Sequence, residues 1–191
     1  MTAALADIEP PEGGWTTDDL DRLPEDGRRR ELIDGVLIVS PSPTNIHQVI
    51  AMRLGTALEE TCPPEYEVTQ AVEVRVSKRR SFTPDVLVTT AEAAARGPHW
   101  FLPHEVLLAV EIVSPSSVTL DRVAKPALYA EAGIPYYWRV ETDGGIAAHT
   151  YRIDPSAGVY VPTGEHTEAV ETDQPWVLSI PIARLTPRFL R

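Results

Sequence analysis

Two carboxylates of this chain lie within or beside apolar runs, and that placement is typical of a metal-binding site. Glu111 is the single charged residue of the run Val106–Val113, and Asp85 lies between Pro84 and three apolar residues. A carboxylate that is buried in an apolar strand loses its hydration, and a metal, a cation or a hydrogen-bond donor must compensate for the loss. Carboxylate oxygens are the hard ligands that Mg²⁺ prefers. The two runs therefore predict one site that binds Mg²⁺, with Mn²⁺ as a substitute.

A lysine and two further side chains could complete a hydrolytic site. Lys125 follows the Glu111 run in a segment that we expect to be helical, and Glu31 and His47 precede the Asp85 run. An ammonium group could position or help to deprotonate an attacking water, or neutralise the charge that develops on a phosphate in the transition state. The pattern predicts hydrolysis of a phosphodiester bond. Lys125 is the expected catalytic cation, and Glu31 and His47 are additional catalytic candidates.

The two strand acids and the lysine also allow purely structural interpretations. Asp85 could be a turn aspartate that follows a proline. Glu111 could form a buried ion pair with Lys125 or Arg122. Lys125 could be an ordinary helix lysine, whose ammonium is usually solvated.

Glu31 and His47 have structural alternatives of their own. Glu31 follows three consecutive arginines, so it could take part in a surface ion pair. His47 lies beside the apolar stripe of a predicted helix, where packing against a sheet is commoner for histidine than a ligand role. Both therefore stay secondary to Asp85, Glu111 and Lys125.

The two acids are expected on strands of one sheet. Within residues 66–76, three valines at positions 72, 74 and 76 alternate with Glu73 and Arg75, which predicts a half-exposed strand. Residues 82–88 predict the strand that holds Asp85. A basic turn at residues 78–81 joins them, so we expect the two strands to be antiparallel neighbours. The run that holds Glu111 is apolar on both faces, which predicts a buried central strand.

A hairpin and two helices are expected around these strands. Residues 31–39 predict two short strands that turn at Asp34-Gly35, because that pair accepts the positive φ of a tight turn. Residues 44–60 have apolar side chains at helical spacing, with Thr44 or Asn45 as a possible N-cap. A second helix should end near Ala132, and the proline after Lys125 predicts that this helix starts or kinks there.

The remainder of the chain predicts strands at residues 134–140 and 145–153, then short strands and irregular structure. A length of 191 residues suits one full hydrophobic core and is short for two. We therefore expect a flexible tail at residues 1–14 and a single domain at residues 15–191. Residues 155–191 would be a β-rich or irregular extension of that domain.

Charge and cysteine content restrict the partners and the compartment. The formal net charge is -11, with 17 basic against 28 acidic residues, which argues against general affinity for nucleic acid. A locally basic cleft or a bound metal can still offset an acidic surface. The chain has one cysteine and neither a leader nor a long apolar span, so we expect a cytoplasmic protein without membrane contact.

Several short sequence words resemble the PD-(D/E)XK nuclease superfamily, and in particular the bacterial restriction endonuclease family called Uma-two. They occur in order across roughly residues 15 to 155, and their order and spacing are more specific than any one of them. The words are Arg30-Glu-Leu-Ile-Asp-Gly35, Ser40-Pro41-Ser42-Pro43 followed by His47, Pro84-Asp85-Val86, Val110-Glu-Ile-Val-Ser-Pro-Ser116, Asp121 with Lys125 and Tyr129, and Gly133-Ile-Pro-Tyr-Tyr-Trp138.

The resemblance implies an α/β, restriction-endonuclease-like core, in which a mixed β-sheet is flanked by helices. Asp85 would then belong to the PD motif, and Glu111 would open the (D/E)XK motif. The lysine position of that motif holds Val113. In the family the amine is thought to come from the next helix, which corresponds to Lys125. The backbone carbonyl of Ile112 or Val113 would be a further metal ligand.

The activity that the resemblance implies is Mg²⁺-dependent hydrolysis of DNA. One alternative is a catalytically inactive module of the same fold, whose acids form a buried ion-pair network. Another is a nuclease that acts on RNA or nucleotides. Cutting both strands of a duplex with one site per chain would require two copies, so we expect a homodimer.

Overall fold

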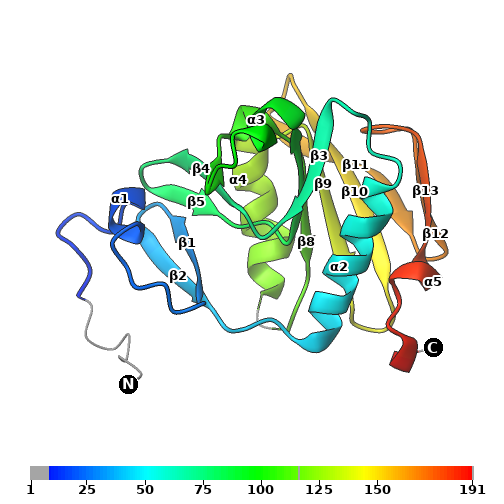
Figure 1. Ribbon diagram of the computed structural model, residues 1–191, viewed down its shortest axis with the longest axis horizontal. Helices are drawn as coiled ribbons and strands as arrows, with labels where there is room; N and C mark the ends of the chain where they lie inside the picture. Colours follow the sequence, from blue (N-terminus) through cyan, green and yellow to red (C-terminus); the bar gives the residue numbers. More distant parts are fainter. Residues whose placement is uncertain (1–8, 116, 191) are drawn as a thin grey trace.

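The structure is a computed structural model of the chain, and it describes residues 9–115 and 117–190. Within these residues, a six-stranded mixed sheet forms the centre of the molecule and has helices on both faces (Figure 1). A five-stranded sheet lies beside it, towards the N-terminus. The prediction of an α/β fold with a mixed sheet flanked by helices is confirmed.

Helices interrupt successive groups of strands along the chain. In chain order they are α1 Thr17–Leu20, β1 Arg29–Ile33, β2 Val36–Ser40, α2 Asn45–Glu59, β3 Tyr66–Gln70, β4 Glu73–Ser77, β5 Arg80–Phe82, β6 Val86–Thr90, α3 Ala91–Ala95, β7 Trp100–Phe101, η2 Pro103–Glu105, β8 Val106–Ile112, η3 Leu120–Ala124, α4 Lys125–Glu131, β9 Tyr136–Glu141, β10 Ala147–Asp154, β11 Val159–His166, β12 Ala169–Thr172, β13 Leu178–Pro181, α5 Ile182–Leu185 and η4 Arg188–Leu190.

The six-stranded sheet has the order β11-β10-β9-β8-β6-β3. β8 and β9 are parallel, and Glu111 pairs with Arg139 between them. The other neighbours are antiparallel, and Val86 of β6 pairs with Val110 of β8. The prediction of a buried central strand at Val106–Val113 is confirmed, because β8 lies between two strands and is almost wholly buried.

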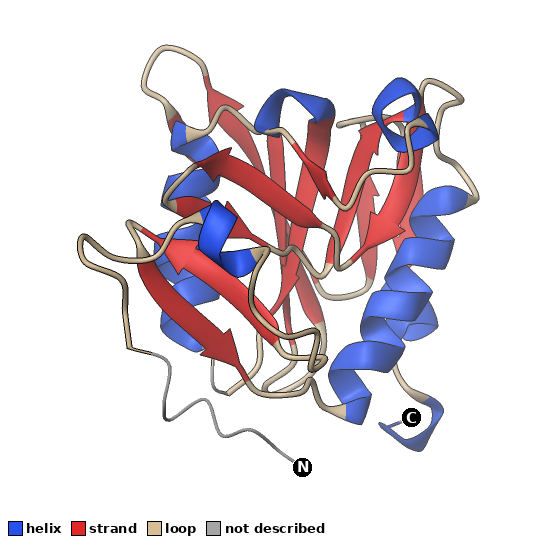
Figure 2. Ribbon diagram, turned by 60° about the vertical axis from the view of Figure 1, so that its left-hand side comes forward, coloured by secondary structure: helices blue, strands red, loops and turns tan. Residues whose placement is uncertain are grey.

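Alternate residues of β8 face two different cores. Val110 and Ile112 pack with α2, whereas Ala109 packs in a second cluster that includes Tyr129 of α4. Figure 1 shows α2 and α4 on opposite sides of this sheet, and Figure 2 shows the arrangement from a second direction. Since side chains alternate along a strand, Glu111 faces α4. This places Glu111 between the helix and the N-terminal sheet.

The predicted pair of long strands at residues 66–76 and 82–88 is divided between the two sheets, which corrects the prediction of two unbroken strands. β3 pairs with β6 in the six-stranded sheet, and β4 pairs with β5 in the five-stranded sheet. The break occurs at Ala71, whose φ is 53°, and opposite it at residues 83–85. Pro84 has no N–H to donate to a ladder, so the hairpin cannot continue through it. Asp85 therefore lies in the break between two strands.

The five-stranded sheet has the order β2-β1-β5-β4-β7 and contains the predicted N-terminal hairpin. Ile33 pairs with Val36 across the turn, where Asp34 has φ 52° and Gly35 has φ 83°. Two consecutive positive φ values define the type I′ turn that suits the twist of a two-residue hairpin. The predicted helix at residues 44–60 is also confirmed as α2, and the Thr44 side chain caps it by accepting from the His47 N–H.

The helical segment before α4 passes through Lys125 without a break. Residues 120–124 form a π-helical turn, in which the Lys125 N–H donates to the Leu120 carbonyl oxygen. This wider turn precedes Pro126, which has no N–H for an α-helical bond. Lys125 is helical and is the first residue of α4, so the predicted start or kink of the helix at this point takes the form of a π turn followed by α4.

Residues near both ends of the described part of the chain pack against the rest of the fold. The expected tail at residues 1–14 includes residues 1–8, which lie outside the described residues. At Trp15 the chain is already part of the fold, because the Trp15 N–H donates to the Gly35 carbonyl oxygen and the indole is buried. At the other end, β12 and β13 pair with each other, and Ile182 and Leu185 join the core under α2. Among the described residues, no helix is long and apolar enough to cross a membrane.

Candidate active site

The predicted site residues come together in one pocket of about 410 Å³. It opens where the β1–β2 hairpin, the start of α2, the end of β8 and the helical segment before α4 meet. Two charged side chains that were not selected as site residues from the sequence, Arg29 and Asp121, also line the pocket. All five predicted catalytic residues line it: Glu31, His47, Asp85, Glu111 and Lys125.

Asp85 is held from three sides. Its Oδ1 lies 2.6 Å from Nη1 of Arg29, and its Oδ2 lies 2.9 Å from Nε2 of His47. The Ile112 N–H donates to the same Oδ2 at 2.8 Å, and the Asp85 N–H donates to the Val110 carbonyl at 3.0 Å. The two backbone hydrogen bonds connect Asp85, which lies between β5 and β6, to the end of β8. They explain why a carboxylate can be buried in this position.

The surroundings of Asp85 favour its ionised form. Burial alone would raise the pKa of this carboxyl, but the hydrogen bond from His47 and the charge of Arg29 outweigh it and lower the pKa to about 2. A carboxylate with these partners stays charged throughout the neutral range. Asp85 is therefore a negatively charged group whose charge the Arg29 guanidinium partly balances.

Glu111 and Lys125 form the buried centre of the cluster. Nζ of Lys125 lies 3.0 Å from Oε1 of Glu111, and the Tyr129 hydroxyl donates to the same oxygen at 2.6 Å. Lys125 is not a solvated helix lysine, because only 4% of its surface is exposed. The partner of Glu111 is Lys125, whereas Arg122 pairs with Glu141 at 2.8 Å.

Two more carboxylates surround the same ammonium group. Oε1 of Glu31 lies 3.1 Å from Nζ of Lys125 and also accepts from the Thr83 N–H. The alternative of a surface ion pair with the neighbouring arginines does not hold for Glu31, because its side chain is buried in the pocket. Asp121 lies one helical turn before Lys125, with Oδ1 3.5 Å from Nζ. Its partner position at i,i+4 was the sequence signal that could have selected it.

Burial and the crowding of these groups raise the pKa values of Glu111, Asp121 and Lys125 alike. Burial raises the pKa of Glu111 well above its usual range, although the charge of Lys125 opposes the shift. Burial also raises the pKa of Asp121. Burial would lower the pKa of Lys125, but Glu111, Glu31 and Asp121 together hold it above its usual range. Lys125 is thus a permanent cation.

Arg29 is a site residue that sequence reasoning missed. It reaches Asp85 from the neighbouring sheet, so the contact depends on how the two sheets pack. A signal was nevertheless present, because residues two apart on a strand share a face and Glu31 was already a candidate. Tyr129 was noted in the sequence only within the family resemblance, and its hydroxyl proves to be a partner of Glu111.

The backbone groups at the end of β8 differ in direction. The Val113 carbonyl oxygen accepts from Oγ1 of Thr142 at 3.0 Å, which turns it towards the segment after β9. The Ile112 N–H faces Asp85, and the N–H and C=O of one extended residue point the same way. Of the two carbonyls that were expected as metal ligands, that of Ile112 therefore suits the pocket and that of Val113 does not.

The donors of the pocket fit a divalent cation in type and in charge. Glu31, Asp85, Glu111 and Asp121 are four buried carboxyl groups, and the permanent cations among them are Arg29 and Lys125. When all are ionised, two negative charges are in excess, and a divalent cation would balance them. In the described part of the chain, no group of three or more His, Cys, Asp or Glu side chains stands ready to hold a metal. A metal would therefore rely on two carboxylates, a backbone carbonyl and water.

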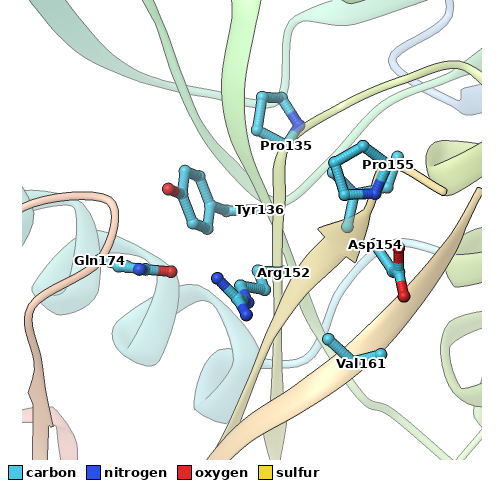
Figure 3. Close-up of a pocket in the computed structure, with 8 residues that line it drawn as sticks. Pro135, Tyr136, Arg152, Asp154, Pro155, Val161 and Gln174 are labelled. Atoms are coloured by element: carbon cyan, nitrogen blue, oxygen red, sulfur yellow. The ribbon is translucent and has the colours of Figure 1, made fainter.

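A second hollow of about 400 Å³ lies at the other end of the parallel strand pair. Its lining includes Tyr136 and Arg152, and Figure 3 shows Arg152 and Gln174 extending towards one another from β10 and from the loop before β13. None of the site residues described above lines it. The acid cluster is therefore the candidate active site.

Fold and site together define a nuclease-like α/β protein. A solved structure described as a "putative nuclease belonging to DUF820 from Anabaena variabilis ATCC 29413" has a TM-score of 0.71 to this chain. The two share 19% sequence identity, and the match covers 89% of this chain and 96% of the other. At this identity the likeness shows a common fold.

Residues 17–184 match the model of the Uma2 family, which is described as "Putative restriction endonuclease". The match spans most of the chain, so the protein belongs to the Uma2 family. The resemblance seen in the sequence words is thereby confirmed. Among curated proteins, none matches this chain.

Proposed function

We propose that this protein is a metal-dependent endonuclease that hydrolyses phosphodiester bonds of DNA. The observation that carries the proposal is the buried contact of Lys125 with Glu111, 3.0 Å apart, in the same pocket as Asp85. Membership of a restriction endonuclease family supports the substrate class. Mg²⁺ is the proposed cofactor, and Mn²⁺ should replace it.

In this proposal Asp85, Glu111 and the Ile112 carbonyl hold the metal. When bound, the metal would act as a Lewis acid on a phosphate oxygen and lower the pKa of a bound water. Lys125 provides positive charge where negative charge develops on the phosphate, and Glu31 and Asp121 fix its direction. The Tyr129 hydroxyl and the Ile112 N–H orient the two carboxylates. His47 holds the second oxygen of Asp85.

The pocket lining favours a backbone phosphate over a free base. No Phe, Tyr or Trp side chain is among the described residues that line it, so it offers no aromatic platform for stacking a base. Its outer wall is rich in hydroxyl and proline side chains, including Ser40, Ser42 and Thr44. Hydroxyl groups are common donors to phosphate oxygens. We therefore favour a polynucleotide substrate over a nucleotide.

Cleavage of plasmid DNA in the presence of Mg²⁺ tests the proposal. Asp85→Ala, Glu111→Ala and Lys125→Ala should each lower the rate by at least about 100-fold, because each removes a charged group from the reacting centre. Asp143→Ala, which removes an exposed acid outside the pocket, is the matched control and should keep the wild-type rate. Circular dichroism confirms folding. Equal activity in all five proteins would show that cleavage comes from a contaminant.

A non-catalytic module of the same fold is the second candidate, and one observation favours it. Both oxygens of Asp85 already have protein partners, and the Lys125 ammonium has three carboxylates within 3.5 Å. Such a network could stabilise the fold without a metal. Thermal unfolding with and without Mg²⁺ separates the two candidates. A nuclease should be stabilised by Mg²⁺ in the wild type and not in Asp85→Ala, whereas the module should be indifferent to the metal.

A further inference from the structure

Arg29 occupies the position at Asp85 that a metal would need. Its Nη1 lies 2.6 Å from Oδ1, while Oδ2 is bound by His47 and by the Ile112 N–H. A carboxylate has about four lone-pair positions, so the open one lies on Oδ1, beside the Arg29 guanidinium. A cation that binds there is repelled by the guanidinium charge, and withdrawal of a donor from Asp85 favours its binding. The Ile112 N–H is fixed in the backbone, and His47 is buried at the start of α2. Arg29 is the donor that can leave.

The surroundings of Arg29 give its guanidinium somewhere to go. Its side chain is 24% exposed, whereas that of Asp85 is 2% exposed. Arg29 lines the site pocket and also a neighbouring hollow of about 430 Å³, and the two share the Pro41–Pro43 wall. A released guanidinium would thus have open space on both sides of the pocket mouth.

Arg29 is also the cation that an incoming phosphate would meet first. Arg29 and Lys125 are the permanent cations among the described residues that line the site pocket. Lys125 is 4% exposed and is surrounded by three carboxylates, so it faces the interior. A guanidinium presents a planar fork that can donate two parallel hydrogen bonds to phosphate oxygens.

We propose that Arg29 is an exchangeable cation. It forms an ion pair with Asp85 in the metal-free protein, and it binds the substrate phosphate once a metal has displaced it from Asp85. This inference rests on the proposed function, because it requires a site for both a divalent cation and a phosphodiester. Metal binding and phosphate binding are then coupled through one side chain. Thermodynamic linkage makes the coupling reciprocal, so each ligand raises the affinity for the other.

The test is calorimetric titration of Mn²⁺ into the wild type, Arg29→Ala, Arg29→Gln and Arg28→Ala, without nucleic acid. Removal of a competing charge beside Asp85 should tighten Mn²⁺ binding in both Arg29 variants by about tenfold. Arg28→Ala removes the same charge from the adjacent residue, which does not line the site pocket, and should leave the affinity unchanged. Arg29→Gln keeps a hydrogen-bond donor at this position and serves as the folded variant if Arg29→Ala unfolds.

The second half of the test uses a short DNA duplex with phosphorothioate linkages, which resist hydrolysis, and measures its binding by fluorescence anisotropy. Mn²⁺ should increase the affinity of the wild type and of Arg28→Ala for this duplex. In the Arg29 variants that increase should fall by about tenfold, although the metal itself binds more tightly. Opposite changes in metal and duplex affinity are a result that a merely structural role of Arg29 would not produce.

The outcomes separate this inference from the proposed function. Equal Mn²⁺ affinity in the wild type and the Arg29 variants would overturn the role of Arg29 while leaving the metal site intact. Mn²⁺ binding that appears only in the Arg29 variants would support strong competition. Lack of Mn²⁺ binding in every folded variant would overturn both the metal site and the inference.

Discussion

At the residue scale, removal of the Tyr129 hydroxyl would show how much one hydrogen bond to the buried Glu111 carboxyl group contributes to stability. It donates to Glu111 at 2.6 Å, and both side chains are buried. Tyr129→Phe removes the donor and leaves the ring, so we expect the free energy of unfolding in urea to fall by about 1.5–3 kcal/mol. Tyr137→Phe is the matched comparison, because the Tyr137 hydroxyl donates at 2.6 Å to the backbone carbonyl oxygen of Asp121, which is an uncharged acceptor. Tyr137→Phe should lower the free energy of unfolding by about 1 kcal/mol. An equal loss of stability in both variants would argue against an ionised Glu111.

Asp85 makes a second residue-scale prediction, which concerns pH. Its partners lower its pKa to about 2, below the ordinary value of 3.8. A carboxyl whose folded pKa is depressed stabilises the protein above its unfolded pKa, and loses that contribution as the pH falls through the folded pKa. The stability difference between wild type and Asp85→Asn should therefore shrink by about 2 kcal/mol as the pH falls from about 5 to about 2. Urea unfolding at several pH values measures it, and a difference independent of pH would contradict the assignment.

Single residues also show what sequence reasoning could and could not reach. Asp85 and Glu111 were found because a carboxylate within an apolar run needs a partner. The position of Lys125 in the pocket followed from the family resemblance, not from its own pattern. Arg29 was missed because its partner lies 56 residues away, in a contact between two sheets. Such contacts depend on packing between elements, and a local pattern does not encode that packing.

At the scale of elements, the N-terminus of α2 connects helix stability with the site. The Thr44 hydroxyl accepts from the His47 N–H, and the same His47 binds Asp85. Thr44→Ala should lower the free energy of unfolding by about 1 kcal/mol, because it removes a side-chain cap. Thr90→Ala is the control, since Thr90 caps the five-residue helix α3 in the same way, outside the pocket. Both should lose stability, but only Thr44→Ala should also weaken metal binding.

Elements with strong local signals were predicted well, and those shaped by tertiary contacts were not. The Asp34-Gly35 turn and the apolar stripe of α2 are local signals, and both elements formed as expected. The split of the long hairpin at Ala71 was not foreseen, because alanine rarely adopts a positive φ and nothing nearby indicates one. Pro84 was visible in the sequence, but the change of sheet that it permits is a property of the whole fold.

At the scale of the whole molecule, the net negative charge of the chain and the carboxylates of the pocket both disfavour the binding of nucleic acid. A net charge of -11 repels nucleic acid at long range. When its four carboxyl groups are ionised, the pocket itself has an excess of two negative charges. A divalent cation would therefore be needed for attraction as well as for chemistry, which is consistent with the coupling proposed for Arg29. This reconciles an acidic chain with a polyanionic substrate.

The expected homodimer is the remaining whole-molecule prediction, since cutting both strands of a duplex requires two sites. Light scattering should give twice the mass of one chain.

β11 and β2 are edge strands of the two large sheets, and Val159 of β11 is 52% exposed. If β11 forms the contact, Val159→Lys should shift the protein to a monomer, because a lysine disfavours edge-to-edge pairing. Val36→Lys, at the 60% exposed start of β2, is the matched control and should leave the dimer intact. Dissociation by Val36→Lys alone would move the contact to the β2 edge beside the site pocket, and a monomeric wild type would contradict the dimer altogether.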